Sequence, residues 1–389
     1  MKKSLLALVA LGAFAGVAQA QSSVTVYGTL DAGFRRDDTG SNLNGVTTGL
    51  VSNTLTSDRL GFRGTEDLGG GQRAFFQLET GMVPFTSNNG RAGAGAGYAT
   101  DNNTPGSFVT TRRESFLGLS DPKLGTLQVG SMYSLGFNFS GYGDATGTNI
   151  LGTDVSHATA VSSATDTAAA TSVGGTTSSF KMNANSQKYI SPRISGVQAT
   201  LYNVTNVTAA SGAGKVVAAE LDYVLGKLEA RAMYEVKQIA TSAASNTITK
   251  HTTMGIAAKY DLGVVKLGIS TQKGDLVSTV ANVVGQTGTV TVNKFTAIAP
   301  ASPVVDIWGG YVTLSENAAG SLYSASGSTA TAAYMVAGAT YKLSKRTNIY
   351  AYYAGMDNKE TTAKFARGSA AGTATFDPSS MGVGMRHSF

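Results

Sequence analysis

Hydrophobic and polar residues alternate with a period of two along most of this chain. In the stretch Ser57–Leu68, Leu60 and Phe62 fall on one face, whereas Arg59 and Arg63 fall on the other. Side chains of a β-strand point alternately to opposite faces, so the stretch predicts a strand with one apolar and one cationic face. The arginine face would be the surface of a soluble protein, or the water-filled lumen of a membrane barrel.

The same alternation recurs through the chain to its last residue. Segments with this pattern lie at 24–36, 74–79, 108–119, 127–130, 217–225, 228–237, 254–262, 265–270, 335–343 and 381–389, whereas the parity of 305–314 is ambiguous. Counting such segments gives about 16 antiparallel strands, joined alternately by short turns and long loops. The pattern therefore predicts an all-β fold, a transmembrane β-barrel of about 16 strands.

The basic residues of these segments indicate which face meets water. A lysine or arginine facing lipid at mid-depth costs roughly 2–4 kcal/mol. Several lipid-facing lysines or arginines would together cost more than the net stability of a domain, about 5–15 kcal/mol. The residues opposite the apolar series are therefore expected to face the lumen: Arg59, Arg63, Arg73, Arg231, Lys259, Lys266 and Lys342. An open sheet of so many strands would leave long edges, which barrel closure removes.

The N-terminus predicts a secretory signal peptide over residues 1–20. Lys2 and Lys3 precede an apolar run, Leu5–Val17, and a small-residue cleavage sequence, Ala18–Ala20. Residues 21–389 would then form one barrel domain. No cysteine is present and no later apolar run reaches about 18 residues, which predicts neither disulfides nor a transmembrane helix.

Residues 134–186 interrupt the alternation and are rich in Ser, Thr, Ala and Gly. A loop of this length inside a compact domain argues against assigning the chain to a single barrel, unless the loop has a function. The segment is therefore expected to be a functional loop.

Nothing in the sequence predicts catalysis, a cofactor or a metal site. His157, His251 and His387 are scattered without ligand spacing. The formal net charge of +6 comes without a Lys/Arg run, so nucleic-acid binding is not expected either.

Several motifs together resemble the general porins of β-proteobacteria. They begin with Ser23-Val-Thr-Val-Tyr-Gly-Thr-Leu-Asp-Ala-Gly33 and continue with Arg59-Leu-Gly-Phe-Arg-Gly-Thr-Glu-Asp-Leu-Gly-Gly-Gly71, Phe76-Gln-Leu-Glu-Thr-Gly81, Arg113-Glu-Ser-Phe-Leu-Gly-Leu119, Tyr341-Lys-Leu-Ser-Lys-Arg-Thr347 and Arg386-His-Ser-Phe389. The resemblance implies a homotrimer of 16-stranded barrels whose third extracellular loop folds into the lumen. Residues 134–186 lie where that loop belongs and would form the constriction.

The resemblance also implies residues for the pore. Acidic groups of the loop would face a ladder of basic residues on the barrel wall. Asp144 is the best loop candidate, with Asp154 and Asp166 as further ones. The wall candidates are Arg59, Arg63, Arg73, Arg113, Arg35 and Lys188, with Arg112 as an alternative to Arg113, whose parity would place it beside Leu117 and Leu119.

The expected function is that of an outer-membrane diffusion channel for small hydrophilic solutes and ions; a solute-specific channel is the alternative. Wall cations outnumber loop anions, which predicts modest anion selectivity. Phe389 ends an amphipathic last strand, as in substrates of the barrel-assembly machinery, and is the candidate assembly signal. Outer-membrane lipid and lipopolysaccharide are the expected surroundings.

Overall fold

The computed structural model describes residues 23–38, 46–85, 111–148, 182–205, 215–242, 247–280, 283–319, 329–358 and 379–389. Nearly all of them lie in β-strands, and the helix α2 spans Leu135–Tyr142. Within these ranges, no helix is long and apolar enough to cross a membrane. The predicted signal peptide, residues 1–20, lies outside the described residues.

Seventeen strands follow one another along the chain. They are β1 (Ser23–Asp38), β2 (Val46–Ser52), β3 (Arg59–Gly69), β4 (Gln72–Gly81), β5 (Thr111–Asp121), β6 (Gly125–Tyr133), β7 (Met182–Ile190), β8 (Val197–Val204), β9 (Lys215–Leu225), β10 (Leu228–Ser242), β11 (Thr247–Asp261), β12 (Lys266–Val280), β13 (Val283–Ser302), β14 (Val305–Ala319), β15 (Thr329–Lys342), β16 (Thr347–Asn358) and β17 (Ser379–Ser388).

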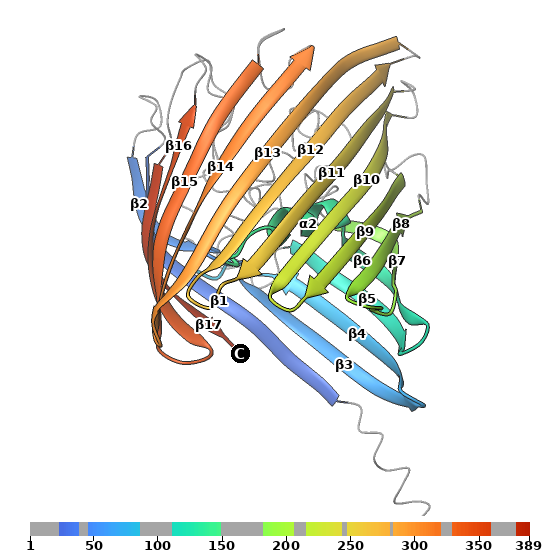
Figure 1. Ribbon diagram of the computed structural model, residues 1–389, viewed down its shortest axis with the longest axis horizontal. Coiled ribbons are helices and arrows are strands. Elements are labelled where there is room, and N and C mark those ends of the chain that lie inside the picture. Colours follow the sequence, from blue (N-terminus) through green and yellow to red (C-terminus); the bar gives the residue numbers. More distant parts are fainter. Residues whose placement is uncertain are drawn as a thin grey trace, which may run out of the picture.

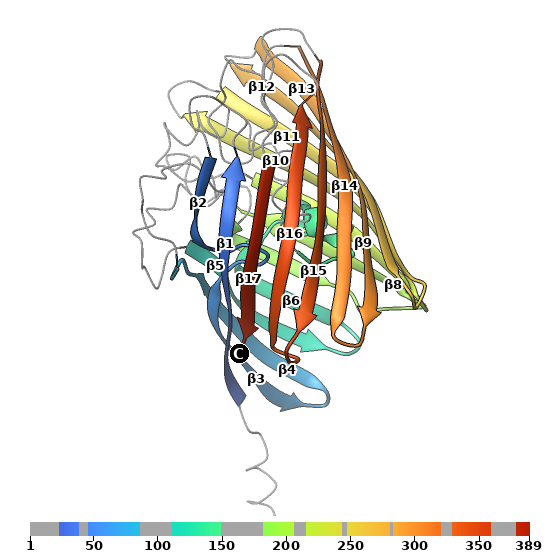
Figure 2. The same cartoon turned by 90° about the vertical axis from the view of Figure 1, so that its left-hand side faces the viewer.

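These strands form a single closed antiparallel sheet, because β1 pairs with β17 at the seam (Figure 1; Figure 2). Both β2 and β3 pair with β1, the first along Ala32–Asp38 and the second along Ser23–Thr29. The two therefore occupy one position of the ring, and the fold is a 16-strand barrel, as predicted.

One end of the barrel carries tight turns that depend on glycine. Gly69, Gly70 and Gly71 link β3 to β4 with φ angles of 85°, 62° and 85°. Residues with a Cβ rarely adopt such angles, so glycine makes this connection possible. The two-residue turn Gly226–Lys227 links β9 to β10 in the same way, with φ of 57° at Gly226.

The period-two pattern separates an outer and an inner face, as predicted. In β9, Val217 and Leu221 are exposed on the outside, while Glu220 and Asp222 are buried inside. Across the described barrel, large apolar side chains are exposed on the outer face and most buried charged groups face inward. The barrel thus has an apolar exterior and a polar interior, which is the inverse of a soluble sheet protein.

The ambiguous parity of residues 305–314 has a structural cause. In β14, Ile307 and Tyr311 are exposed outside, whereas Trp308, Val312 and Leu314 are buried inside. The three inner residues join an apolar cluster on the inner face of β13–β16. Both faces of this strand are therefore apolar, and alternation alone could not assign them.

Three boundaries differ from the sequence-based prediction. A further strand, β2, begins at Val46 between the alternating segments predicted at 24–36 and from Ser57, and the strand expected from Ser57 begins at Arg59. The loop expected over 134–186 includes the helix α2, and β7 begins within it at Met182. In the second case the chain leaves the sheet between β2 and β3, and a local pattern cannot show such a break.

Candidate functional site

The inner face of β3 carries Arg59 and Arg63, with Gly61 between them. Tyr27 of β1 lies beside this strand, and the Arg63 guanidinium carbon is 5.0 Å from the centroid of the Tyr27 ring. A Cβ added at Gly61 would clash with that ring, so glycine makes the close approach possible. Among the described residues, neither arginine has a carboxylate within ion-pair distance.

Arg113 lies on the same side of the barrel but is paired. Its Nε donates to Oε1 of Glu79 on β4, and its guanidinium carbon is 5.5 Å from the centroid of the Tyr133 ring. The Tyr27 hydroxyl donates to the other oxygen of Glu79 at 3.0 Å. Glu79 therefore neutralises one of the wall cations that the sequence indicated.

A β-bulge explains why Arg113 points inward although Leu117 points outward. Leu78 pairs with Ser115 and Thr80 pairs with Arg112, so β5 contains one more residue than β4 between these pairs. An extra residue shifts the alternation of side chains by one position. The buried, ion-paired side chain of Arg113 is thus the inward one, which answers the parity question raised by the sequence.

The other predicted wall residues, Arg35, Lys188 and Arg73, lie on different strands from Arg59 and Arg63. Arg35 on β1 is buried, and its Nε lies 2.8 Å from Oδ2 of Asp37. Lys188 on β7 is buried with its Nζ 5.9 Å from the centroid of the Tyr202 ring. Arg73 is exposed beside the Gly69–Gly71 turn. The structure therefore does not bring Arg73 to the level of Arg59.

The opposite wall, formed by β9–β11, pairs its cations with carboxylates. Arg231 contacts Asp222 at 2.7 Å and Glu220 at 3.2 Å. The Lys259 ammonium lies 2.8 Å from Oε2 of Glu229. On the same wall, a lysine and a glutamate of β10, Lys237 and Glu235, are 3.0 Å apart. The charges of this wall largely cancel over short distances.

The helix α2 packs on the inner side of that wall (Figure 1). Ser134 caps its N-terminus by accepting a hydrogen bond of 3.2 Å from the Phe137 amide. The Gly136 amide donates to Oε2 of Glu235 at 3.0 Å, and Lys294 of β13 donates to the Ser140 carbonyl at 2.6 Å. The described part of the predicted loop is therefore bound to lumen-facing side chains of the barrel.

Tyr142, at the end of α2, lies between two cations. The Arg231 guanidinium carbon is 3.8 Å and the Lys259 ammonium 4.4 Å from the centroid of its ring. Each cation–π contact contributes about 0.5–2 kcal/mol, depending on desolvation. Electrostatics as well as hydrogen bonds thus hold α2 against β10 and β11.

Asp144 follows α2 and is buried. Its Oδ1 accepts hydrogen bonds of 2.7 Å from both the amide and the hydroxyl of Thr146. Burial raises the pKa of the Asp144 carboxyl above its usual range, and the nearby Lys294 ammonium opposes that shift. Asp144 holds its own turn and is not open to channel water, unlike the loop carboxylate that the sequence suggested; Asp154 and Asp166 lie outside the described residues.

Phe389 completes the seam of the barrel. Its amide and carbonyl exchange hydrogen bonds of 3.1 and 3.0 Å with the carbonyl and amide of Gly28 on β1. The Phe389 ring covers Gly28, where a Cβ would clash with it. The last residue of the chain is therefore part of the closing ladder.

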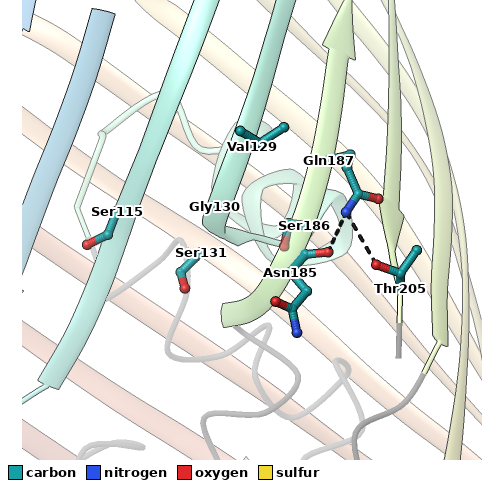
Figure 3. A pocket seen from close by; sticks show the side chains of 8 residues that line it. All are labelled: Ser115, Val129, Gly130, Ser131, Asn185, Ser186, Gln187 and Thr205. Atoms are coloured by element: carbon teal, nitrogen blue, oxygen red, sulfur yellow. Dashed lines mark hydrogen bonds between the residues drawn. The ribbon is translucent and has the colours of Figure 1, made fainter. Parts of the chain in front are cut away.

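An open groove of about 470 Å³ lies on the outside of the barrel, at the ends of β5–β8 (Figure 3). The Gln187 amide nitrogen donates to the Asn185 carbonyl at 2.8 Å and to the Thr205 hydroxyl at 3.4 Å (Figure 3). Ser115, Val129 and Gln187 belong to the outward-facing series of their strands, so the groove opens on the outer face.

The carboxylates of the wall are the functional residues that the candidate set lacked. Glu79, Glu220, Asp222, Glu229 and Glu235 all form ion pairs inside the barrel. Their place in the alternation already indicated the inner face. Sequence alone could not show which cations they neutralise, because the partners lie on different strands.

Comparisons with known proteins agree with this geometry. The profile of a family described as Gram-negative porin matches residues 7–361. An outer membrane porin protein of Bordetella pertussis is 26% identical over 440 aligned residues, which cover 100% of both chains.

Solved structures share the fold. An anion-selective porin from Comamonas acidovorans matches with a TM-score of 0.72 and 21% identity over 95% of this chain and 100% of that one. An outer membrane protein of Vibrio cholerae, OmpT in its trimer form, matches with a TM-score of 0.64 and 13% identity over 95% of this chain and 99% of that one.

Proposed function

The chain belongs to the Gram-negative porin family and is an outer-membrane β-barrel porin, and on this premise we propose that it conducts small hydrophilic solutes and ions with a modest preference for anions. Diffusion would be passive, through the polar interior of the barrel. The name of the similar Comamonas porin, which is anion-selective, supports this direction of selectivity.

The observation that carries the anion preference is the state of Arg59 and Arg63. Both face the lumen from the wall on which Glu79 is paired with Arg113. Neither has an ion pair among the described residues. Two cations four residues apart on one strand produce a local positive potential that paired charges elsewhere do not cancel at short range.

The interaction energy between these arginines and a passing ion is large enough for a preference for anions but too small to exclude cations. Across about 8 Å of water, one charge acts on a passing ion with only about 0.5 kcal/mol. Several charges together, focused by low-dielectric walls, reach a few kT. The paired wall of β9–β11 contributes little, so the net effect remains modest.

The reversal potential under a KCl gradient across a planar bilayer tests this proposal. We expect an anion-selective wild type and a shift towards cations in the double variant Arg59→Ser with Arg63→Ser. Arg73→Ser is the matched control, because Arg73 is exposed at the turn end and its loss should change selectivity little. A cation-selective wild type, or a double variant like the wild type, would contradict the proposal.

The third loop, residues 134–186, would narrow the channel. The contacts of α2 with β10, β11 and β13 support this role, since they bind a loop segment to the inner wall. A channel from which the loop is deleted should have a larger single-channel conductance than the wild type.

We further infer a homotrimer, as in the trimer form of the similar Vibrio protein, surrounded by outer-membrane lipid and lipopolysaccharide. The exposed apolar side chains of the outer face provide the surface that such contacts require. Comparing heated and unheated samples by gel electrophoresis would show whether the barrel assembles as a heat-sensitive trimer.

Phe389 would be the signal that the barrel-assembly machinery recognises. Its hydrogen bonds to Gly28 show that it also contributes to the seam. Deletion of Phe389 should lower the yield of folded trimer in cells, whereas refolding into vesicles without the machinery should be reduced less. An unchanged yield in cells would contradict this role.

A further inference from the structure

One position of the barrel ring is interrupted by a segment that turns into the lumen. Between the pairs Ala32–Ser52 and Thr29–Arg59, β1 advances from residue 32 to 29 while its partner advances from 52 to 59. The extra residues form the inner turn, Asn53–Asp58, which leaves the ladder between β2 and β3. The inner turn directly precedes Arg59.

The inner turn projects to the inside and not towards the membrane. Leu55 is buried among the apolar side chains that β13–β16 direct inward, including Trp308 and Tyr350. Thr54 lies over the inner face of Gly33, where an added Cβ would be 3.3 Å from the Thr54 Cβ. Polypeptide thus occupies part of the lumen next to β1.

Asp31 of β1 holds the inner turn. Its Oδ2 accepts hydrogen bonds from the Leu55 amide at 2.8 Å, from the Thr56 amide at 2.7 Å and from the Thr56 hydroxyl at 3.2 Å. Its Oδ1 accepts a hydrogen bond from the Tyr350 hydroxyl of β16. The side chain is fully buried, so without these donors the carboxylate would be strongly destabilising.

Further bonds tie both ends of the turn. The Asn53 amide donates to the Asp31 carbonyl at 3.1 Å, and the Met82 amide donates to the Asp58 carbonyl at 3.0 Å. The Asp58 carboxylate accepts from the Asp31 amide. The position of the turn, and with it the start of β3, is therefore fixed from β1, β16 and the end of β4.

The carboxylates that anchor the inner turn and the start of α2 lie at opposite points of the ring, whereas the end of α2 reaches Lys294 of β13. Asp31 is on β1, and α2 is bound to β10; seven ring positions separate these two strands in either direction when β2 and β3 count as one. Each insert is held by a buried carboxylate that accepts backbone amides, Asp31 in one case and Glu235 in the other.

We propose that the inner turn is a second constriction element facing the start of α2 across the channel, and that Asp31 is the positioning residue that fixes both the turn and the direction of Arg59. This inference rests on the proposed channel function. It predicts that the width and the selectivity of the channel depend on a residue that itself makes no contact with passing ions.

The test compares Asp31→Asn with Asp37→Asn in planar bilayers. Both substitutions remove one negative charge from the inner face of β1, and Asp37 pairs with Arg35 outside the inner turn. Loss of charge alone should make either channel more anion-selective at unchanged conductance. Release of the inner turn should instead raise the conductance of Asp31→Asn and shift its selectivity towards cations, because Arg59 loses its fixed position.

Two further variants sharpen the test, and the first of them keeps it decisive if Asp31→Asn folds poorly. Tyr350→Phe removes a single donor to Asp31 and should shift both quantities in the same direction by a smaller amount. Gly33→Cys with Thr54→Cys would place two Cβ atoms 3.3 Å apart, close to the Cβ separation in a disulfide. The native chain has no cysteine that could interfere. Oxidation of this pair in the Asp31→Asn background should restore the wild-type conductance.

The outcomes separate this inference from the channel function itself. An ohmic channel in which Asp31→Asn behaves like Asp37→Asn, and in which Tyr350→Phe is unchanged, overturns the positioning role and leaves the channel function intact. Absence of any channel in the wild type would overturn the proposed function instead.

Discussion

The β1–β5 wall and the β9–β11 wall of the lumen both carry inward-facing cations, but the two walls differ in how these cations are paired with carboxylates. On the first wall, Arg63 lies over the Tyr27 ring, and neither Arg63 nor Arg59 has a carboxylate partner among the described residues. On the second, Arg231 and Lys259 each form an ion pair and also contact Tyr142. The field in the channel therefore depends on how each cation is paired and not on the number of cations.

Burial explains the difference. The helix α2 covers part of the β9–β11 wall, whose buried charges are Glu220, Asp222, Glu235 and Lys237, and a buried ion is strongly destabilising unless it is paired. Arg63 is exposed and Arg59 only half-buried, so water stabilises both. One wall therefore binds a loop, and the other keeps charges that can act on passing ions.

The largest effect is expected from Glu235→Ala, which breaks the attachment of α2. The buried Glu235 accepts the Gly136 amide and pairs with Lys237, and removing one partner of a buried ion pair costs about 3–5 kcal/mol. Equilibrium unfolding in detergent or vesicles measures this loss. Glu229→Ala, at a partly exposed ion pair of the same wall, should cost less than about 1 kcal/mol; equal losses would contradict the comparison.

Tyr142→Leu should loosen the end of α2 with a smaller effect. The substitution removes two cation–π contacts, each contributing about 0.5–2 kcal/mol. Greater fluctuation of the open-channel current is the expected readout. Tyr142→Phe keeps the ring between Arg231 and Lys259 and should remain as quiet as the wild type; equal noise in both variants would show that the ring does not hold the helix.

Glu79→Gln should sharpen the contrast by removing the carboxylate partner of Arg113. Removing this one negative charge makes the energy of an anion at about 8 Å more favourable by about 0.5 kcal/mol, so anion selectivity should rise. The reversal potential measures this change. On the opposite wall, Asp222→Asn leaves Arg231 with Glu220 at 3.2 Å and should shift selectivity less. A larger shift from Asp222→Asn would contradict the assignment of the two walls.

The smallest effect is expected at high ionic strength, where the wild type and the double serine variant should differ least in selectivity. Raising the ionic strength from about 0.01 to 1 M shortens the Debye length from about 30 to 3 Å. The selectivity that depends on Arg59 and Arg63 should therefore fade, and the wild type and the double serine variant should converge at high salt. A difference that persists at 1 M would point to a steric cause.

The sequence by itself determined which side of each regular strand meets water. Alternation is a local consequence of the pleat, so it assigned Arg59, Arg63, Glu220 and Asp222 to the inner face and predicted the barrel. The motifs of the first and last strands supplied the family, and the family profile confirmed it.

Tertiary structure decided which residues meet. The bulge that turns Arg113 inward, its pairing with Glu79 and the burial of Asp144 depend on strand register and on where the loop returns to the wall. The inner turn interrupts the ring position shared by β2 and β3, and it is held by Asp31, which also accepts a hydrogen bond from Tyr350 of β16, far away in the sequence. Closure of the barrel creates these contacts, and a pattern of period two has no information about partners on distant strands.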